Sequence, residues 1–117
     1  MGCIREGSLS SGRVLANLDG NFVREGEEKS GYIMANFSGS HIKEGCSPHG
    51  EVIARLEGNY IKEGASPTDE AIACIDGIYI LYIKGSEREI LFNIDGYASM
   101  YEKAALATAA LMLKGLA

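Results

Sequence analysis

The chain has 117 residues, a net charge of −5 and 46% apolar residues, as expected for one globular domain with its own core. No basic surplus exists to neutralise phosphates, so nucleic acid is not an expected partner. The N-terminus lacks the apolar run of a signal peptide, and the longest uncharged stretch, Ala104 to Leu113, is about half a membrane span. We therefore expect a cytoplasmic protein with no membrane partner.

A glycine recurs every nineteen residues, which marks an internal repeat and a repeated unit of structure. The five members are Gly20, Gly39, Gly58, Gly77 and Gly96. Before the first full repeat, residues 2–7 align with the second half of a repeat, such as residues 21–26. The chain therefore begins with half a repeat.

Each repeat opens with a run in which apolar residues alternate, the pattern of a strand with one buried face. The columns that begin at Val14, Ala16 and Leu18 are expected to face the core. The column that begins at Leu15 lies on the other face and is expected to be partly covered. That outward face also holds the column Asn17, Asn36, Arg55, Cys74 and Asn93.

An Asp-Gly pair or its equivalent follows each first strand, and such a pair between apolar runs predicts a tight β-hairpin turn. The returning strand carries Val23, Ile42, Ile61 and Ile80 on one face and aromatic and basic residues on the other. In repeat four, residues 81–83 replace the usual Lys-Glu-Gly, so we expect a longer strand or a bulge there. One such hairpin is too small to be stable alone.

The fold class predicted is mainly β with one C-terminal helix, built from five hairpin repeats of about 19 residues. The last repeat has no second strand after Gly96, and the N-terminal half-repeat supplies one. We expect this pairing to close a ring or barrel, which removes exposed strand edges. The alternative is an open β-solenoid, which the period also permits. Residues 1–96 would form the β domain and residues 97–117 a helix packed in or on it.

The C-terminal segment begins with a capping box, Ser99 to Glu102, which predicts the start of a helix. It carries no charge between Lys103 and Lys114, so it must be buried on most of its circumference. It could thread the ring, lie across an open end or pair with a second chain. We favour threading, because the segment is uniformly apolar and the column of four alanines leaves room.

No residue pattern indicates catalysis, a cofactor or a metal site. The three cysteines have no ligand spacing and are expected to be free thiols, while His41 and His49 lack a second ligand nearby. Two charged columns repeat around the ring, and their simplest role is in turns and cross-strand ion pairs. The acidic column is Asp19, Glu57, Asp76 and Asp95, and the basic column is Arg5, Arg24, Lys43 and Lys62.

We therefore expect a non-enzymatic binding or assembly module that acts on a protein partner or by self-assembly. The alternative is a ring that binds a small ligand or a cation, in which symmetry multiplies a weak contact. Aromatic and basic side chains are common contact anchors. The candidate binding residues are Phe22, Arg24, His41, Lys43, Tyr60, Lys62 and Tyr79.

Residues 13–26 and 51–64 resemble repeats in small uncharacterised bacterial proteins. They are also similar in style to the family of β-flower proteins, in which short hairpins radiate around an axis. The resemblance covers residues 2–96 and leaves out the terminal segment. It implies a fold and a repeat module of unknown role, and it transfers no functional residues.

Overall fold

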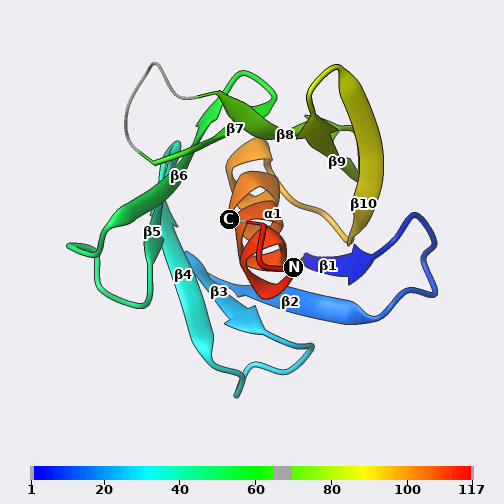
Figure 1. The fold of residues 1–117 in the computed structure, drawn as a ribbon. Helices are drawn as coiled ribbons and strands as arrows, with labels where there is room; N and C mark the ends of the chain where they lie inside the picture. Colours follow the sequence, from blue (N-terminus) through cyan, green and yellow to red (C-terminus); the bar gives the residue numbers. More distant parts are fainter. Residues whose placement is uncertain (1, 65–69, 117) are drawn as a thin grey trace.

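The computed structural model describes residues 2–64 and 70–116, which form ten strands and one helix (Figure 1). Residues 1 and 65–69 of the expected β domain, and residue 117 of the expected helical segment, lie outside the described residues. The elements are β1 (Cys3–Glu6), β2 (Val14–Asp19), β3 (Phe22–Glu25), β4 (Ile33–Ser38), β5 (His41–Glu44), β6 (Val52–Glu57), β7 (Tyr60–Glu63), β8 (Ala71–Asp76), β9 (Tyr79–Lys84), β10 (Glu87–Asp95) and α1 (Met100–Leu113).

The strands form a closed antiparallel barrel in which β1 pairs with both β2 and β10. The N-terminal half-repeat thus completes the last repeat, as predicted, and the open solenoid is wrong. The closing strand reproduces the geometry of the internal repeats. The amide of Leu18 donates to the carbonyl of Gly2 at 3.0 Å, and the amide of Phe37 donates to that of Asn21 at 3.0 Å.

The helix α1 runs through the centre of the ring, as predicted (Figure 1). Its residues from Ala104 to Leu111 are fully buried, and the first-strand alanines, such as Ala16 and Ala54, are fully buried around it. Small side chains let the helix backbone approach the strands, and its most extensive contacts are with β2 and β4. The buried hydroxyl of Thr108 donates to the carbonyl of Ala104 at 2.8 Å, so it needs no partner from the barrel.

Both ends of α1 are capped by their own sequence. Ser99 accepts from the amide of Glu102, whose side chain accepts from the amide of Ser99, which confirms the capping box. At the other end the amides of Gly115 and Leu116 donate to carbonyls of the last turn, with Gly115 at a φ of +72°. The helix therefore begins where the sequence predicts, and it ends just before Gly115.

A β-bulge recurs in the first strand of each repeat. Because of it, the prediction that the column of Val14 faces the core is wrong. In β2, Ala16 pairs with Ile4 and Val14 pairs with Arg5, so Leu15 is the extra residue. The same step recurs at Met34, Ile53, Ile72 and Leu91. Leu15 and Met34 belong to the core, whereas the column of Val14 lies opposite outward basic residues. The alternation of side chains inverts at each bulge, which a period of two in the sequence did not reveal.

The column of Asn17 lies on the outer face of the barrel, as predicted, but the loops cover it more completely than expected. Asn17, Asn36 and Asn93 are at most 6% exposed because the loops between hairpins fold over them. The side-chain amide of Asn36 donates to the carbonyls of Gly45 and Ser47 at 2.8 and 2.9 Å. Asn17 and Asn93 make the same pair of bonds to their own loops, so this column anchors the loops to the barrel wall.

Repeat four differs from the others as the sequence predicts. Strands β9 and β10 extend into one long hairpin, in which Lys84 pairs with Glu87 across a two-residue turn. In the other hairpins the turn residues are the glycine and the residue after it, with Gly20 at a φ of +62°. Asp19 ends its strand rather than entering the turn, so only the glycine of the Asp-Gly pair takes the positive φ.

Candidate functional site

The barrel has two different ends. The tight turns at Gly20, Gly39, Gly58 and Gly77 lie at the end where α1 begins, and we call this the turn end. The longer connections, such as residues 7–13 and 26–32, lie at the end where α1 finishes, and we call this the loop end. Because α1 fills the axis, each end is a separate surface.

The turn end exposes four large apolar side chains. Tyr97 is 83% exposed, Tyr101 50%, Ile78 49% and Met100 37%. Tyr97, Met100 and Tyr101 surround the start of α1, and the ammonium of Lys103 donates to the carbonyl of Gly77 at 2.8 Å. That bond places the turn of Ile78 beside the first turn of the helix. We call these four residues the apolar end patch.

The aromatic members of the predicted binding set lie at the same end of the barrel as this patch, on the outer wall. Each is the first residue after a tight turn. Their pairs across the hairpins are Phe22 with Asp19, His41 with Ser38, Tyr60 with Glu57 and Tyr79 with Asp76. His41 is exposed and the other three are half-buried. The structure thus arranges these four side chains around the margin of the turn end.

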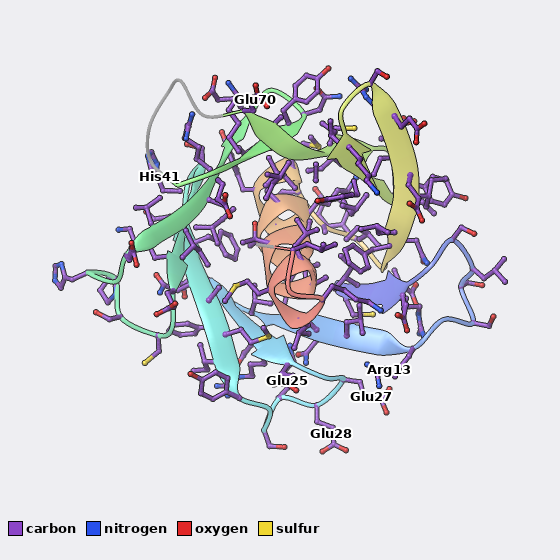
Figure 2. The ribbon with its side chains drawn as sticks, in the orientation of Figure 1. Arg13, Glu25, Glu27, Glu28, His41 and Glu70 are labelled. Carbon is purple, nitrogen blue, oxygen red and sulfur yellow. The ribbon has the colours of Figure 1, made fainter. Side chains whose placement is uncertain are left out.

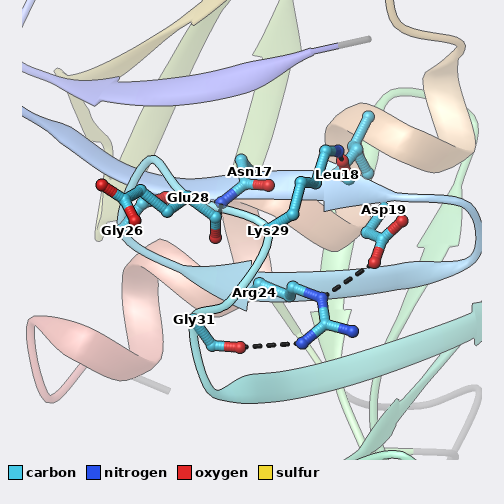
Figure 3. A network of polar contacts seen from close by, with 8 residues as sticks. All are labelled: Asn17, Leu18, Asp19, Arg24, Gly26, Glu28, Lys29 and Gly31. Carbon is cyan, nitrogen blue, oxygen red and sulfur yellow. Dashed lines mark hydrogen bonds and ion pairs between the residues drawn. The ribbon is translucent and has the colours of Figure 1, made fainter.

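The basic members of the set are held by the barrel itself. The guanidinium of Arg24 donates to the carboxylate of Asp19 at 2.8 Å and to the carbonyl of Gly31 at 2.9 Å (Figure 3). The ammonium of Lys43 donates to the carbonyl of Pro48 at 2.7 Å, and that of Lys62 lies 3.5 Å from Glu57. These side chains tie turns and loops to the wall, which is the simpler of the two roles considered for the charged columns.

The acidic column shows no metal centre. Asp19 and Asp95 make ion pairs with Arg24 and Arg5 at 2.8 and 3.0 Å. A hydrogen bond from Arg55 holds the pKa of Glu57 below its ordinary value, with Lys62 adding to the effect. Within residues 2–64 and 70–116, no three acidic, histidine or cysteine side chains gather closely enough to hold a metal ion.

The cysteines are separate free thiols. Cys3 is half-buried, Cys46 exposed and Cys74 buried, and burial raises the pKa of the Cys3 thiol. Arg88 lies over the ring of Tyr60 at 5.6 Å and approaches the sulfur of Cys74 at 3.8 Å. This contact fastens the long β9–β10 hairpin to the neighbouring wall and brings no base to the thiol.

Sequence reasoning missed the apolar end patch. Its one signal was Ile78, which stands where other repeats carry Asn21, Ser40 and Asn59. Tyr97 and Met100 could not be recognised by comparing the repeats, because they follow the last repeat. Their exposure depends on where α1 enters the ring, and only the structure shows this.

The fold and its sites define a closed ring of five β-hairpins, over the residues described, wrapped around one central helix. A family model described as "6-fold beta flower protein" matches residues 4–115, and the chain belongs to that family. The described part of this ring has five hairpins, one of them formed by the first and last strands, β1 and β10. No curated protein and no solved structure matches. Among the described residues, no helix combines the length and the apolar character needed to cross a membrane.

Proposed function

We propose that this chain is a non-enzymatic assembly module that self-associates through the apolar end patch. The observation that carries the proposal is a cluster of four exposed apolar side chains at one end of the ring, from 37% to 83% exposed. Exposed apolar side chains gathered at one end of a molecule favour a protein contact site, whereas single exposed apolar residues need no explanation.

The size of the surface fits a protein partner. A tyrosine side chain buries on the order of 200 Å², so Tyr97 and Tyr101 alone would contribute roughly 250 Å². An ordinary interface takes about 800 Å² from each partner, with an apolar centre and a more polar margin. The apolar end patch would supply the centre, and Phe22, His41 and Tyr79 would supply the margin.

The charges around the patch permit contact between two copies. The turn end carries three ion-paired carboxylates, those of Asp19, Glu57 and Asp95, each with a basic partner on the same chain. Their repulsion across a two-fold contact is therefore reduced. A two-fold dimer brings the same patch together from both chains, so one self-complementary surface is sufficient.

The alternative, a ring that binds a small ligand or cation, is less well supported. A ligand on the symmetry axis would need the space that α1 occupies with fully buried residues from Ala104 to Leu111. The repeated basic side chains Arg24, Lys43 and Lys62 are also engaged by carboxylates and carbonyls of the barrel.

Sedimentation velocity over a wide range of protein concentration tests the proposal. We expect a concentration-dependent dimer that the double variant Ile78→Asn, Tyr97→Ser shifts to monomer. The asparagine copies the residue of other repeats, which keeps the turn intact. Tyr32→Ser is the matched control, because Tyr32 is 73% exposed but lies at the loop end.

A wild-type monomer at every concentration refutes self-association. If Tyr32→Ser weakens the dimer and the double variant does not, the contact lies at the loop end. That result refutes the role of the apolar end patch. A Tyr60→Ser, Lys62→Ala variant tests the outer wall. If the outer wall forms only the margin of the contact, this variant should weaken the dimer less than the double variant does.

A further inference from the structure

A cleft opens at the loop end, opposite the apolar end patch. It has a volume of about 280 Å³ and lies between β2, β3 and the last residue of α1. Its lining residues are Arg13, Val14, Leu15, Glu25, Gly26 and Leu113. Ligand pockets for drug-sized molecules are roughly 300–1,000 Å³, so this cleft suits a smaller molecule.

The two charged walls of the cleft have opposite signs and are not paired. In the described part of the chain, neither the guanidinium of Arg13 nor the carboxylate of Glu25 has a side-chain hydrogen bond or an ion pair. Nearly all other basic side chains there have a partner, with Lys84 as the exception. Both residues lie in the same sector of the ring in Figure 2. Their unpaired charges can therefore bind a ligand that carries both a carboxylate and an ammonium.

The repeats show that this pair is particular to one sector. The positions equivalent to Arg13 hold Tyr32, Glu51, Glu70 and Glu89, none of which is basic. The position equivalent to Glu25 in the first half-repeat holds Glu6, which the ammonium of Lys114 engages. Among the described repeats, the sector of β2 and β3 is therefore the one that has a basic residue at the position of Arg13 and a free carboxylate at the position of Glu25.

The floor of the cleft is apolar and its inner edge is the C-terminal end of the helix. Val14 is half-buried, and Leu113 keeps 40% of its surface exposed at the mouth. The C-terminal end of a helix carries partial negative charge, which adds to that of Glu25 in attracting a cation. An arginine side chain can bind a carboxylate with two parallel hydrogen bonds.

We propose that this cleft binds a free α-amino acid with an aliphatic side chain. Arg13 binds its carboxylate, and Glu25 binds its ammonium. Val14 and Leu113 contact its side chain. The inference does not depend on self-association, since the cleft and the apolar end patch lie at opposite ends of the ring.

Titration of the ¹⁵N-labelled protein with L-leucine, followed by NMR, tests this binding. We expect saturable shifts of the amide signals of Gly26 and Leu113. Leucinamide lacks the carboxylate and N-acetyl-leucine lacks the ammonium, so each is expected to bind at least about ten-fold more weakly. A loss of the same size is expected for leucine with Arg13→Gln and with Glu25→Gln.

The control is Glu44→Gln, the equivalent of Glu25 one repeat later, which is expected to bind leucine as the wild type does. Arg13 and Glu25 are exposed, so the variants should keep the wild-type melting temperature. The absence of saturable shifts with L-leucine refutes the site. Equal binding of leucine and N-acetyl-leucine refutes the role of Glu25, and equal binding by Arg13→Gln refutes the role of Arg13.

Discussion

Replacement of Asn36 by alanine tests the anchoring of the loops. Asn36 is 3% exposed, and its amide donates to the carbonyls of Gly45 and Ser47 at 2.8 and 2.9 Å. Each neutral hydrogen bond contributes about 1 kcal/mol net. The substitution removes the donor to Gly45, while the carbonyl of Ser47 keeps the amide of Gly50 as a donor. We expect the free energy of unfolding to fall by about 2–3 kcal/mol. In a domain of this size that corresponds to a decrease in melting temperature of about 8–12 °C.

Urea unfolding followed by circular dichroism measures the loss, since the chain has no tryptophan. The matched control is Asn21→Ala, because Asn21 is exposed and should change stability by less than about 0.5 kcal/mol. Hydrogen exchange at residues 45–51 supplies a local measurement, and the loop amides should exchange faster in Asn36→Ala even where the barrel remains folded. If Asn36→Ala matches the control in both measurements, the loops are held by other contacts and the anchoring role is wrong.

Four further substitutions test the ring, its core and its charges. A Cβ on Gly31 would lie 2.1 Å from a backbone carbonyl oxygen, so Gly31→Ala should destabilise by about 2–4 kcal/mol in urea unfolding. Gly39→Ala meets open space at a φ of +58° and should lose only about 1 kcal/mol, and equal losses would contradict the clash. Leu106 is fully buried, so Leu106→Ala should lower the free energy of unfolding by about 2–5 kcal/mol, and a loss like that of an exposed site would mean that α1 does not fill the ring. The hydrogen bond from Arg55 lowers the pKa of Glu57 in the folded state, so its stabilisation is present above the ordinary pKa of about 4.3 and is lost as the pH falls further. The melting temperature of Glu57→Gln should thus fall less steeply in acid than that of the wild type, and parallel curves would show that the bond is not formed in solution.

The candidate contact surfaces show how much of a site a repeat can predict. Phe22, His41, Tyr60 and Tyr79 form a column in the sequence, and the structure places them on successive hairpins around the turn end. The basic column could be recognised in the sequence in the same way. Its contacts with carboxylates and loop carbonyls could not be predicted from the sequence. A side chain such as Arg24 meets Gly31 only after the loop has folded back over the wall.

Much of the architecture follows from the sequence alone. The spacing of Gly20 and its equivalents gives the hairpins, because a two-residue turn needs a positive φ that glycine adopts easily. The half-repeat at residues 2–7 gives the closure, because an unpaired strand edge is unfavourable. The uncharged run after Lys103 gives a buried helix, because a helix that is apolar on all sides must be covered.

The tertiary structure decided which faces the repeated columns present and which surfaces remain open. The bulge at Leu15 inverts the alternation, and the loops bury Asn17, because both depend on how neighbouring hairpins pack. The exposure of Tyr97 depends on where α1 enters the ring, and the cleft between Arg13 and Glu25 depends on where α1 ends. Local sequence fixes the conformation of each repeat, but contacts between segments far apart in the chain determine what each repeat shows to solvent.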